Sequence, residues 1–154
     1  MSLKFGLTGS TGSLGKNLIL NNRGIKFICF KGDIRNKIKI SSWIQKNNFD
    51  ALIHLAAIVP IKVVNKNKKK AYNVNYIGTK NIVDCLISSN IKWFFFSSTS
   101  HVYESTIKKI KETSKVSPIS YYGKTKYLAE KYIIKKLLNT KTKYCIGRIF
   151  STSN

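Results

Sequence analysis

The sequence predicts a single α/β domain in which helices cover both faces of a parallel sheet, giving three layers. Three observations support this fold class. Apolar runs of strand length alternate with segments of helical periodicity. A glycine-rich turn joins the first strand-like run to the first helical segment. The chain has 154 residues, 43% of them hydrophobic, and no linker or internal repeat divides it, so residues 1–154 are expected to share one core.

Each expected strand is a short run of mainly apolar residues bounded by small or turn-forming residues. The run from Trp93 to Phe96 is apolar at every position, as in strands that are buried on both faces of a parallel sheet. In chain order, the expected strands span residues 4–8, 26–30, 51–55, 93–96 and 143–149.

Each expected helix has apolar residues three or four positions apart. The third shows this most clearly, because Val74, Ile77, Ile82 and Leu86 fall near one stripe. The fourth follows Pro118, which breaks the preceding chain. In chain order, the expected helices span residues 13–20, 38–45, 71–88 and 121–138.

Net charge is the most unusual feature of the composition, since 28 Lys and Arg against six Asp and Glu give +22. Such a chain binds polyanions non-specifically at low salt. Only three of the 28 are Arg, the residue favoured for bidentate phosphate and base contacts, so no specific nucleic-acid partner is predicted. The run from Lys66 to Lys70 lies in a polar connection and is expected to form a solvated loop.

The cysteines and the N-terminal residues indicate the compartment. Cys29, Cys85 and Cys145 form no CxxC or His-linked pattern, so buried free thiols are expected and no metal site is predicted. The sequence shows neither a signal peptide nor an apolar run of the roughly 20 residues that a bilayer requires. A cytoplasmic protein without membrane contact is therefore expected.

The turn after the first strand predicts a dinucleotide site. Gly9, Gly12 and Gly15 allow a tight turn, close approach to a pyrophosphate and close packing of the helix on the strand. The helix N-terminus then offers N–H groups and a positive dipole to phosphates. An acidic residue roughly 20 positions further on usually holds the adenosine ribose, and Asp33 is the candidate. This pattern is typical of a Rossmann-type, doubly wound sheet.

A second pattern, Tyr122 with Lys126, indicates acid/base chemistry. The two residues lie four apart and share one helical face, and a nearby ammonium lowers the pKa of a phenol. In a lysine-rich chain the spacing also arises by chance. The hydroxyls of Ser97 to Ser100 follow a strand, where parallel sheets bind ligands, although Ser and Thr also form turns. His54 lies within a strand and is expected to be a hydrogen-bonded core residue rather than a catalytic one.

Taken in order, these stretches resemble the extended short-chain dehydrogenase/reductase superfamily, in its NAD-dependent epimerase/dehydratase branch. The resemblance covers nearly the whole chain and rests on several motifs in register. The matching stretches are Thr8-Gly9-Ser10-Thr11-Gly12-Ser13-Leu14-Gly15, Gly32-Asp33-Ile34-Arg35-Asn36, Ile53-His54-Leu55-Ala56-Ala57, Asn75-Tyr76-Ile77-Gly78-Thr79, Ser97-Ser98-Thr99-Ser100-His101-Val102-Tyr103, Ser120-Tyr121-Tyr122-Gly123-Lys124-Thr125-Lys126 and Arg148-Ile149-Phe150.

The resemblance implies a role for each matching residue. Tyr122 would be the catalytic acid/base, Lys126 would lower its pKa and bind the nicotinamide ribose, and Thr99 would polarise the reacting oxygen of the substrate. The implied cofactor-binding residues are Gly9, Thr11, Gly12, Ser13, Leu14, Gly15, Asp33, Ile34, Leu55, Ala56, Ala57, Asn75, Tyr122, Lys126 and Phe150.

The implied activity is hydride transfer between a nucleotide sugar and NAD or NADP. NAD is slightly preferred, because Asp33 would repel a 2′-phosphate, although Lys31 and Arg35 could accept one. Ser100-His101 stands where dehydratases of the family carry Asp-Glu, which favours an epimerase or a ketoreductase. A non-catalytic dinucleotide-binding or redox-sensing module is the alternative, and a nucleic-acid binder rests on charge alone.

Three further expectations depend on the resemblance. The segment before Asp33 is short, so the second strand is expected to be shortened or merged, and Ser151 replaces an Asn found in many relatives. Relatives continue for about as long again into a domain that binds the nucleotide sugar, so residues 1–154 are expected to be the cofactor half of a longer enzyme. The alternative is a chain that has lost this substrate domain. A homodimer through the helices at 71–88 and 121–138 is also expected.

Overall fold

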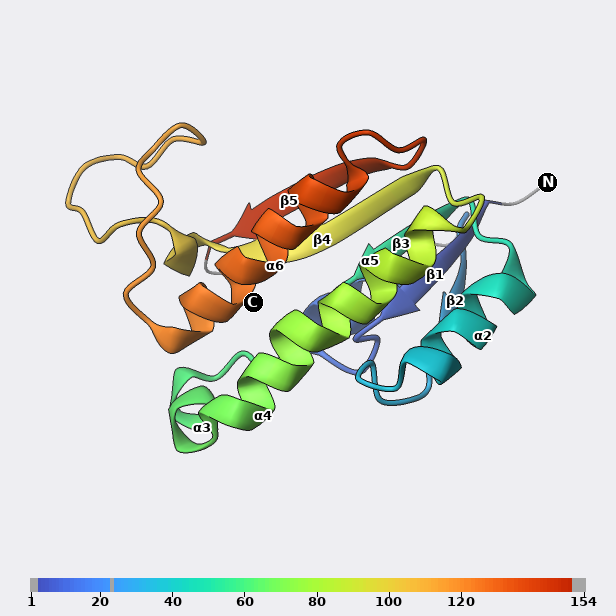
Figure 1. The fold of residues 1–154 in the computed structure, drawn as a ribbon, viewed down its shortest axis with the longest axis horizontal. Coiled ribbons are helices and arrows are strands. Elements are labelled where there is room, and N and C mark those ends of the chain that lie inside the picture. The colour runs from blue at the N-terminus through green and yellow to red at the C-terminus, as the bar shows by residue number, and fades with distance from the viewer. Residues whose placement is uncertain (1–2, 23, 151–154) are drawn as a thin grey trace.

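The computed structural model describes residues 3–22 and 24–150, and these form a parallel sheet flanked by helices (Figure 1). The strands are β1 (Lys4–Thr8), β2 (Lys26–Cys29), β3 (Ala51–His54), β4 (Trp93–Thr99) and β5 (Lys143–Ile149). The helices are α1 (Ser13–Asn21), α2 (Lys37–Asn47), α3 (Ile61–Lys66), α4 (Lys68–Tyr72), the π-helical η1 (Asn73–Gly78), α5 (Thr79–Ile87), the 3-10 turn η2 (Ser100–Val102) and α6 (Tyr121–Leu137). The α/β fold class expected from the sequence is confirmed.

The strand order is β2-β1-β3-β4-β5, and every neighbouring pair is parallel. From β1 the chain crosses first toward one edge of the sheet and then, from β2 onward, toward the other. Because such crossovers are right-handed, α1 lies on the face opposite the later helices. Figure 1 shows α2, α5 and α6 side by side over one face. The sheet is therefore doubly wound, as the sequence predicts, and a single four-residue strand, β2, precedes Asp33.

The main core lies between the sheet and the helices α2, α5 and α6. Side chains alternate between the two faces of a strand, so Phe94 and Phe96 of β4 and Leu52 of β3 point toward these helices, and each is at most 1% exposed. The helices contribute the apolar residues Ile40, Ile44, Ile82, Val83, Leu86, Ala129, Ile133 and Leu137 to the same cluster.

The opposite face is covered less completely than expected. Ile53 and Phe95 are only partly buried there, Trp93 is 52% exposed, and Cys145 is exposed. The expectation that all three cysteines are buried is therefore wrong for Cys145, and Cys29 is only partly buried. Within the part of the chain that the structure describes, only the β1–α1–β2 crossover runs in the direction that places a helix on this face, which leaves β3, β4 and β5 open.

The lysine-rich connection is also different from the expectation, because it forms the two short helices α3 and α4. Val64 and Ala71 are fully buried and anchor them, while Lys66 to Lys70 remain exposed. The Asn67 side chain accepts a hydrogen bond from the Lys70 N–H and caps α4. The lysines are solvated as expected, but the prediction of a loop is wrong. One buried residue in each short helix, Val64 in α3 and Ala71 in α4, anchors it to the rest of the protein.

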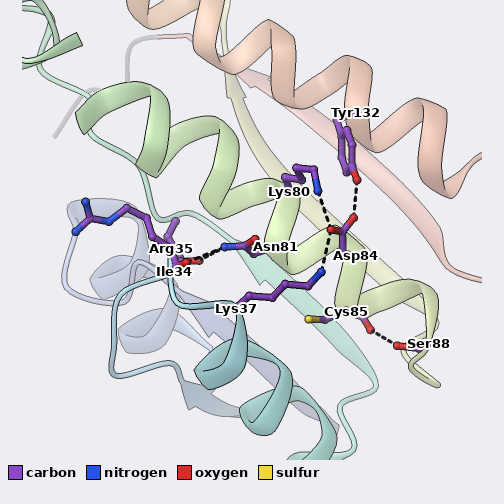
Figure 2. A network of polar contacts seen from close by, with 9 residues as sticks. All are labelled: Ile34, Arg35, Lys37, Lys80, Asn81, Asp84, Cys85, Ser88 and Tyr132. Carbon is purple, nitrogen blue, oxygen red and sulfur yellow. Dashed lines mark hydrogen bonds and ion pairs between the residues drawn. The ribbon is translucent and has the colours of Figure 1, made fainter. Parts of the chain in front are cut away.

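Polar contacts join the three helices of the covered face (Figure 2). The Asp84 carboxylate of α5 accepts hydrogen bonds from Lys37 of α2 at 3.3 Å, Lys80 of α5 at 3.0 Å and the Tyr132 hydroxyl of α6 at 2.5 Å. Burial alone would raise the pKa of Asp84, but these three donors together lower it.

Among the described residues, no helix has both the length and the apolar character needed to cross a membrane.

Candidate active site

The loop after β1 is held tightly against the loop after β3. Gly9 has a φ of +79°, a left-handed conformation that favours glycine, and a Cβ there would lie 2.5 Å from the Ala56 nitrogen. The Leu55 N–H donates to the Thr8 carbonyl at 3.1 Å. Consequently Leu55 and Ala56, which the sequence predicts to line the cofactor site, do lie beside the glycine loop.

The first turn of α1 is open toward solvent. Thr11, Gly12, Ser13 and Leu14 are all exposed, whereas Gly15 is buried beneath them. Gly12 is the N-cap residue and has no side chain to accept a hydrogen bond, and a Cβ on it would meet only the Gly9 carbonyl, at 3.5 Å. Unpaired N–H groups at an open helix N-terminus fit the pyrophosphate of a dinucleotide.

Asp33 and Ile34, expected near the adenine, occupy different environments. The exposed Asp33 carboxylate forms an ion pair with Arg35 and accepts its N–H at 2.9 Å, and these hydrogen bonds lower the pKa of Asp33. Ile34 is 5% exposed and packs closely against Gly78. A Cβ on Gly78 would lie only 2.6 Å from the Ile34 side chain. Asn81 of α5 donates to the carbonyls of Ile34 and Arg35, as Figure 2 shows. The contacts of Asp33 and Ile34 with the adenine remain a prediction.

A buried chain of hydrogen bonds links β1, β3 and α5. His54 is fully buried; its Nδ1 lies 2.6 Å from the Thr8 hydroxyl and its Nε2 lies 2.9 Å from the Thr79 hydroxyl. Thr79 donates its own hydrogen to the Asn75 carbonyl, so it accepts from Nε2–H, and Nδ1 accepts from Thr8. Burial, with a smaller effect of Lys126, lowers the pKa of His54 to about 3. The prediction of a hydrogen-bonded core histidine is confirmed.

Asn75 lies in the π-helical turn η1 and is fully buried. Its side chain binds both backbone groups of Ile58, accepting the N–H at 2.8 Å and donating to the carbonyl at 3.0 Å. It also donates to the Thr125 hydroxyl of α6 at 3.2 Å. Asn75 therefore ties the loop that follows Ala57 to the helix that carries Tyr122, a structural role that the sequence analysis did not assign.

Two of the three expected catalytic residues, Thr99 and Tyr122, come together at the carboxyl end of β4, and Lys126 lies one helical turn after Tyr122 in α6. Thr99 closes the strand, and its hydroxyl accepts the His101 N–H at 3.2 Å and hydrogen bonds with Tyr122. Tyr122 lies in the first turn of α6, where Ser120 caps the helix by accepting the Gly123 N–H at 3.0 Å. A Cβ on Gly123 would lie 2.2 Å from the His101 carbonyl oxygen, so glycine here lets α6 approach the end of β4.

Lys126 is 2% exposed, and its Nζ lies 4.1 Å from the centre of the Phe96 ring of β4. Burial lowers the pKa of Lys126 to about 7, against the opposing charge of Glu130. Burial also raises the pKa of Tyr122, which the hydrogen bond with Thr99 partly offsets. This direction is opposite to the lowered phenol pKa expected from the sequence, because burial disfavours the phenolate form.

Phe150, expected beside the nicotinamide, follows β5 and is 55% exposed, with its ring stacked on Tyr103 at a centroid distance of 6.4 Å. Ser151 lies outside the described residues.

The family model of the NAD dependent epimerase/dehydratase family matches residues 7–153. The chain belongs to this family. Its sequence is 32% identical over 100 residues to the bifunctional UDP-glucose 4-epimerase and UDP-xylose 4-epimerase 1 of Pisum sativum. This match covers 64% of this chain and 29% of the pea enzyme. It is 30% identical over 144 residues to the GDP-6-deoxy-D-talose 4-dehydrogenase of Aggregatibacter actinomycetemcomitans, covering 87% of this chain and 48% of that enzyme.

A solved structure of the dTDP-4-dehydrorhamnose reductase of Bacillus anthracis in complex with NADP is also similar. The TM-score is 0.87 at 26% identity, and the match covers 97% of this chain and 54% of the reductase. The chain thus spans about half, or less, of the length of these two relatives and of the solved structure.

The sequence analysis gave no role to two polar residues that form an ion pair with each other, one of which acts on Lys126 through its charge. These are Glu130, which lies one turn after Lys126 in α6, and Arg148 of β5. The sequence held a usable signal, because only six acidic residues occur in the chain and Glu130 continues the four-residue spacing from Tyr122 through Lys126.

Proposed function

We propose that this chain forms the dinucleotide-binding and catalytic part of an enzyme that oxidises and reduces a nucleotide sugar with NAD or NADP. The position of Thr99 beside Tyr122 at the end of β4, with Lys126 one helical turn further along α6, supports this proposal most directly. The two relatives and the reductase described above each carry position 4 in the name of their activity. Carbon 4 of the sugar is therefore the proposed reacting centre.

The cofactor would be held by the groups that the glycine loop leaves open. The N–H groups of the first turn of α1 would bind the pyrophosphate, Ala56 and Ala57 would line the cleft, and Lys126 would bind the nicotinamide ribose. When bound, the nicotinamide supplies the hydride acceptor for oxidation and the hydride donor for reduction.

The side chains of the chain itself supply the proton chemistry. Thr99 would donate its hydroxyl hydrogen to the sugar oxygen at the reacting carbon, and Tyr122 Oη would exchange the proton of that oxygen. The phenolate form of Tyr122 needs a stabilising charge, because burial raises its pKa. The charged form of Lys126, four residues away in the same helix, would provide it.

The contacts of the nucleotide and of the sugar are proposed to come largely from polypeptide outside these residues. The matched region makes up 29% and 48% of the two relatives and 54% of the solved neighbour, which leaves room for such a part. The chain alone is expected to bind dinucleotide and to turn over sugar slowly or not at all.

Calorimetric titration with NAD, NADH, NADP and NADPH tests the proposal. The chain should bind one pair with a Kd in the micromolar range, and Gly12→Trp should abolish binding because the indole would fill the open side of the loop. The backbone accepts a side chain at Gly12, since its φ is −76° and a Cβ there makes only an ordinary contact. Gly24→Trp is the matched control, because Gly24 is exposed and a Cβ there meets nothing within 4 Å.

Two outcomes would contradict the proposal. Absence of binding to all four dinucleotides would show that these residues do not form a working site. Equal binding by wild type and Gly12→Trp would place the dinucleotide elsewhere. In contrast, binding that Gly24→Trp retains and Gly12→Trp loses would support the glycine loop as the site and identify the preferred cofactor.

A further inference from the structure

The Glu130 carboxylate is 1% exposed and joins three elements of the fold. Ser98 of β4 donates its hydroxyl to Oε1, and Arg148 of β5 donates through Nε at 3.2 Å and through Nη2 at 2.8 Å to Oε2. A carboxylate is rarely buried so completely unless it is paired and hydrogen-bonded. Glu130 therefore fixes the middle of α6 against the carboxyl ends of β4 and β5.

The same region of α6 carries Lys126, one helical turn before Glu130. The two side chains lie on one face of the helix, opposite Phe96 and Ser98, which are two residues apart and so share one face of β4. Lys126 contacts the Phe96 ring, and Glu130 binds the Ser98 hydroxyl. The two charged residues of α6 thus contact the last part of β4 just before Thr99.

Burial disfavours the ammonium form of Lys126 and lowers its pKa to about 7, whereas the charge of Glu130 acts in the opposite sense. Among residues 3–22 and 24–150, the other groups around this pair add no second anion at neutral pH. His54 of β3 is neutral, Tyr122 is a phenol with a raised pKa, and Arg148 of β5, which also bonds Tyr103, is a cation. Glu130 is hence the anion that favours the charged form of Lys126, in addition to the Phe96 ring.

Resting on the function proposed above, we propose that Glu130 is a positioning residue for the Tyr122/Lys126 pair: it holds α6 against β4 and β5 and supplies the negative charge that keeps Lys126 an ammonium. Arg148 completes the hydrogen bonding of Glu130. As a cation beside the same carboxylate, it should act on Lys126 in the opposite electrostatic sense. The charge of Lys126 depends on the balance between these two partners.

This balance separates an electrostatic role from a merely structural one. Glu130→Gln and Arg148→Met should both destabilise the fold, because each variant removes one member of the buried ion pair and leaves the other without its counter-charge. Their effects on Lys126 should have opposite signs. Removing the carboxylate should lower the pH at which Lys126 titrates, and removing the guanidinium should raise it, each by about one pH unit.

The experiment is an NMR titration of the chain labelled with carbon-13 at the lysine Cε positions, with the Lys126 signal identified by its loss in Lys126→Met. The wild type should titrate near pH 7. The double variant Glu130→Gln/Arg148→Met should titrate between the two single variants. No cofactor or sugar is present, so the result does not depend on whether the proposed function is correct.

Opposite shifts in the two single variants would support the proposal. Shifts in the same direction, or midpoints in both variants equal to that of the wild type, would overturn it and leave Glu130 with a structural role only. If Glu130→Gln does not fold, Arg148→Met alone decides, because an upward shift supports the charge balance and an unchanged midpoint contradicts it.

Discussion

Two basic side chains, His54 and Lys126, lie almost entirely inside this domain, at 0% and 2% exposure. Water cannot solvate their charged forms there, so burial is the main cause of the lowered pKa of each. The two differ in their polar contacts. Both nitrogens of His54 have hydrogen-bond partners that suit the neutral ring, whereas Lys126 faces an aromatic ring and a carboxylate that suit its charged form. His54 therefore stabilises the fold, and Lys126 has the features of a functional residue.

The pKa of His54 predicts how stability depends on pH. The unfolded chain binds a proton at this residue below its ordinary pKa of about 6.5, whereas the folded chain does not until about pH 3. Over that range the unfolded state binds more protons, so the free energy of unfolding falls as the pH decreases. The loss attributable to His54 should be about 2 kcal/mol between pH 7 and pH 5.

Urea denaturation of the wild type and of His54→Gln at both pH values measures this difference. The variant will be less stable at pH 7, but its stability should fall less between pH 7 and pH 5. His101→Gln is the matched control, because His101 is exposed and the variant should keep the pH dependence of the wild type. Parallel curves for wild type and His54→Gln would mean that His54 titrates normally in the folded protein.

At the scale of the secondary structure elements, the π-helical turn η1 connects the cofactor loops to the catalytic helix. Such turns are rare and frequently occur at functional sites. Here the turn presents Asn75 to the backbone of Ile58 and, on the other side, to Thr125 of α6. The loop after β3 and the first turns of α6 are thereby held through one amide side chain.

Asn75→Ala should lower the free energy of unfolding by about 2–3 kcal/mol, because the buried N–H and carbonyl of Ile58 lose their partner. Asn65→Ala is the control: Asn65 is exposed in α3, and the change should stay within about 0.5 kcal/mol of the wild type. Urea denaturation at pH 7 measures both. A loss below about 1 kcal/mol in Asn75→Ala would indicate that water replaces the amide.

Most elements were predictable from the sequence because each buries a face whose periodicity is visible in it. The strand ending at Ile149 and the helix beginning at Tyr121 are observed at those boundaries. The helices α3 and α4 were missed because exposed lysines surround their few buried residues. The exposure of Cys145 was not predictable either, because it depends on which face of the sheet the crossovers leave open.

The candidate site was predicted as a set of residues but not as an environment. The family resemblance implied that Thr99 and Tyr122 act together, and in the structure the two side chains are hydrogen-bonded. The direction of the Tyr122 pKa shift was wrong, because burial of a phenol by residues distant in the sequence leaves no mark on the Tyr-x-x-x-Lys spacing. The contact of Glu130 with Arg148 joins residues 18 positions apart in two elements and likewise follows from the fold alone.

At the scale of the whole molecule, a net charge of +22 determines how the fold responds to salt. Repulsion among 28 basic residues opposes the compact state, while the few ion pairs stabilise it. Both effects weaken as the Debye length falls from about 30 Å at 0.01 M salt to about 10 Å at 0.1 M. Because basic residues greatly outnumber acidic ones, the free energy of unfolding should rise between 10 and about 300 mM NaCl.

Removing the Asp84 carboxylate should make the free energy of unfolding depend more steeply on salt than it does in the wild type. Asp84→Asn removes the carboxylate that Lys37 and Lys80 share, so their mutual repulsion should lower stability by about 1–2 kcal/mol at low salt and by less at high salt. Glu112→Gln makes the same charge change on an exposed loop and should respond to salt as the wild type does. Urea denaturation is the suitable measurement, because urea adds no ions. Equal free energies of unfolding for the wild type and Asp84→Asn at 10 mM NaCl would show that the contacts of the Asp84 carboxylate with Tyr132 and the two lysines add no net stability. A fall in wild-type stability with salt would mean instead that local ion pairs outweigh the repulsion of the whole chain.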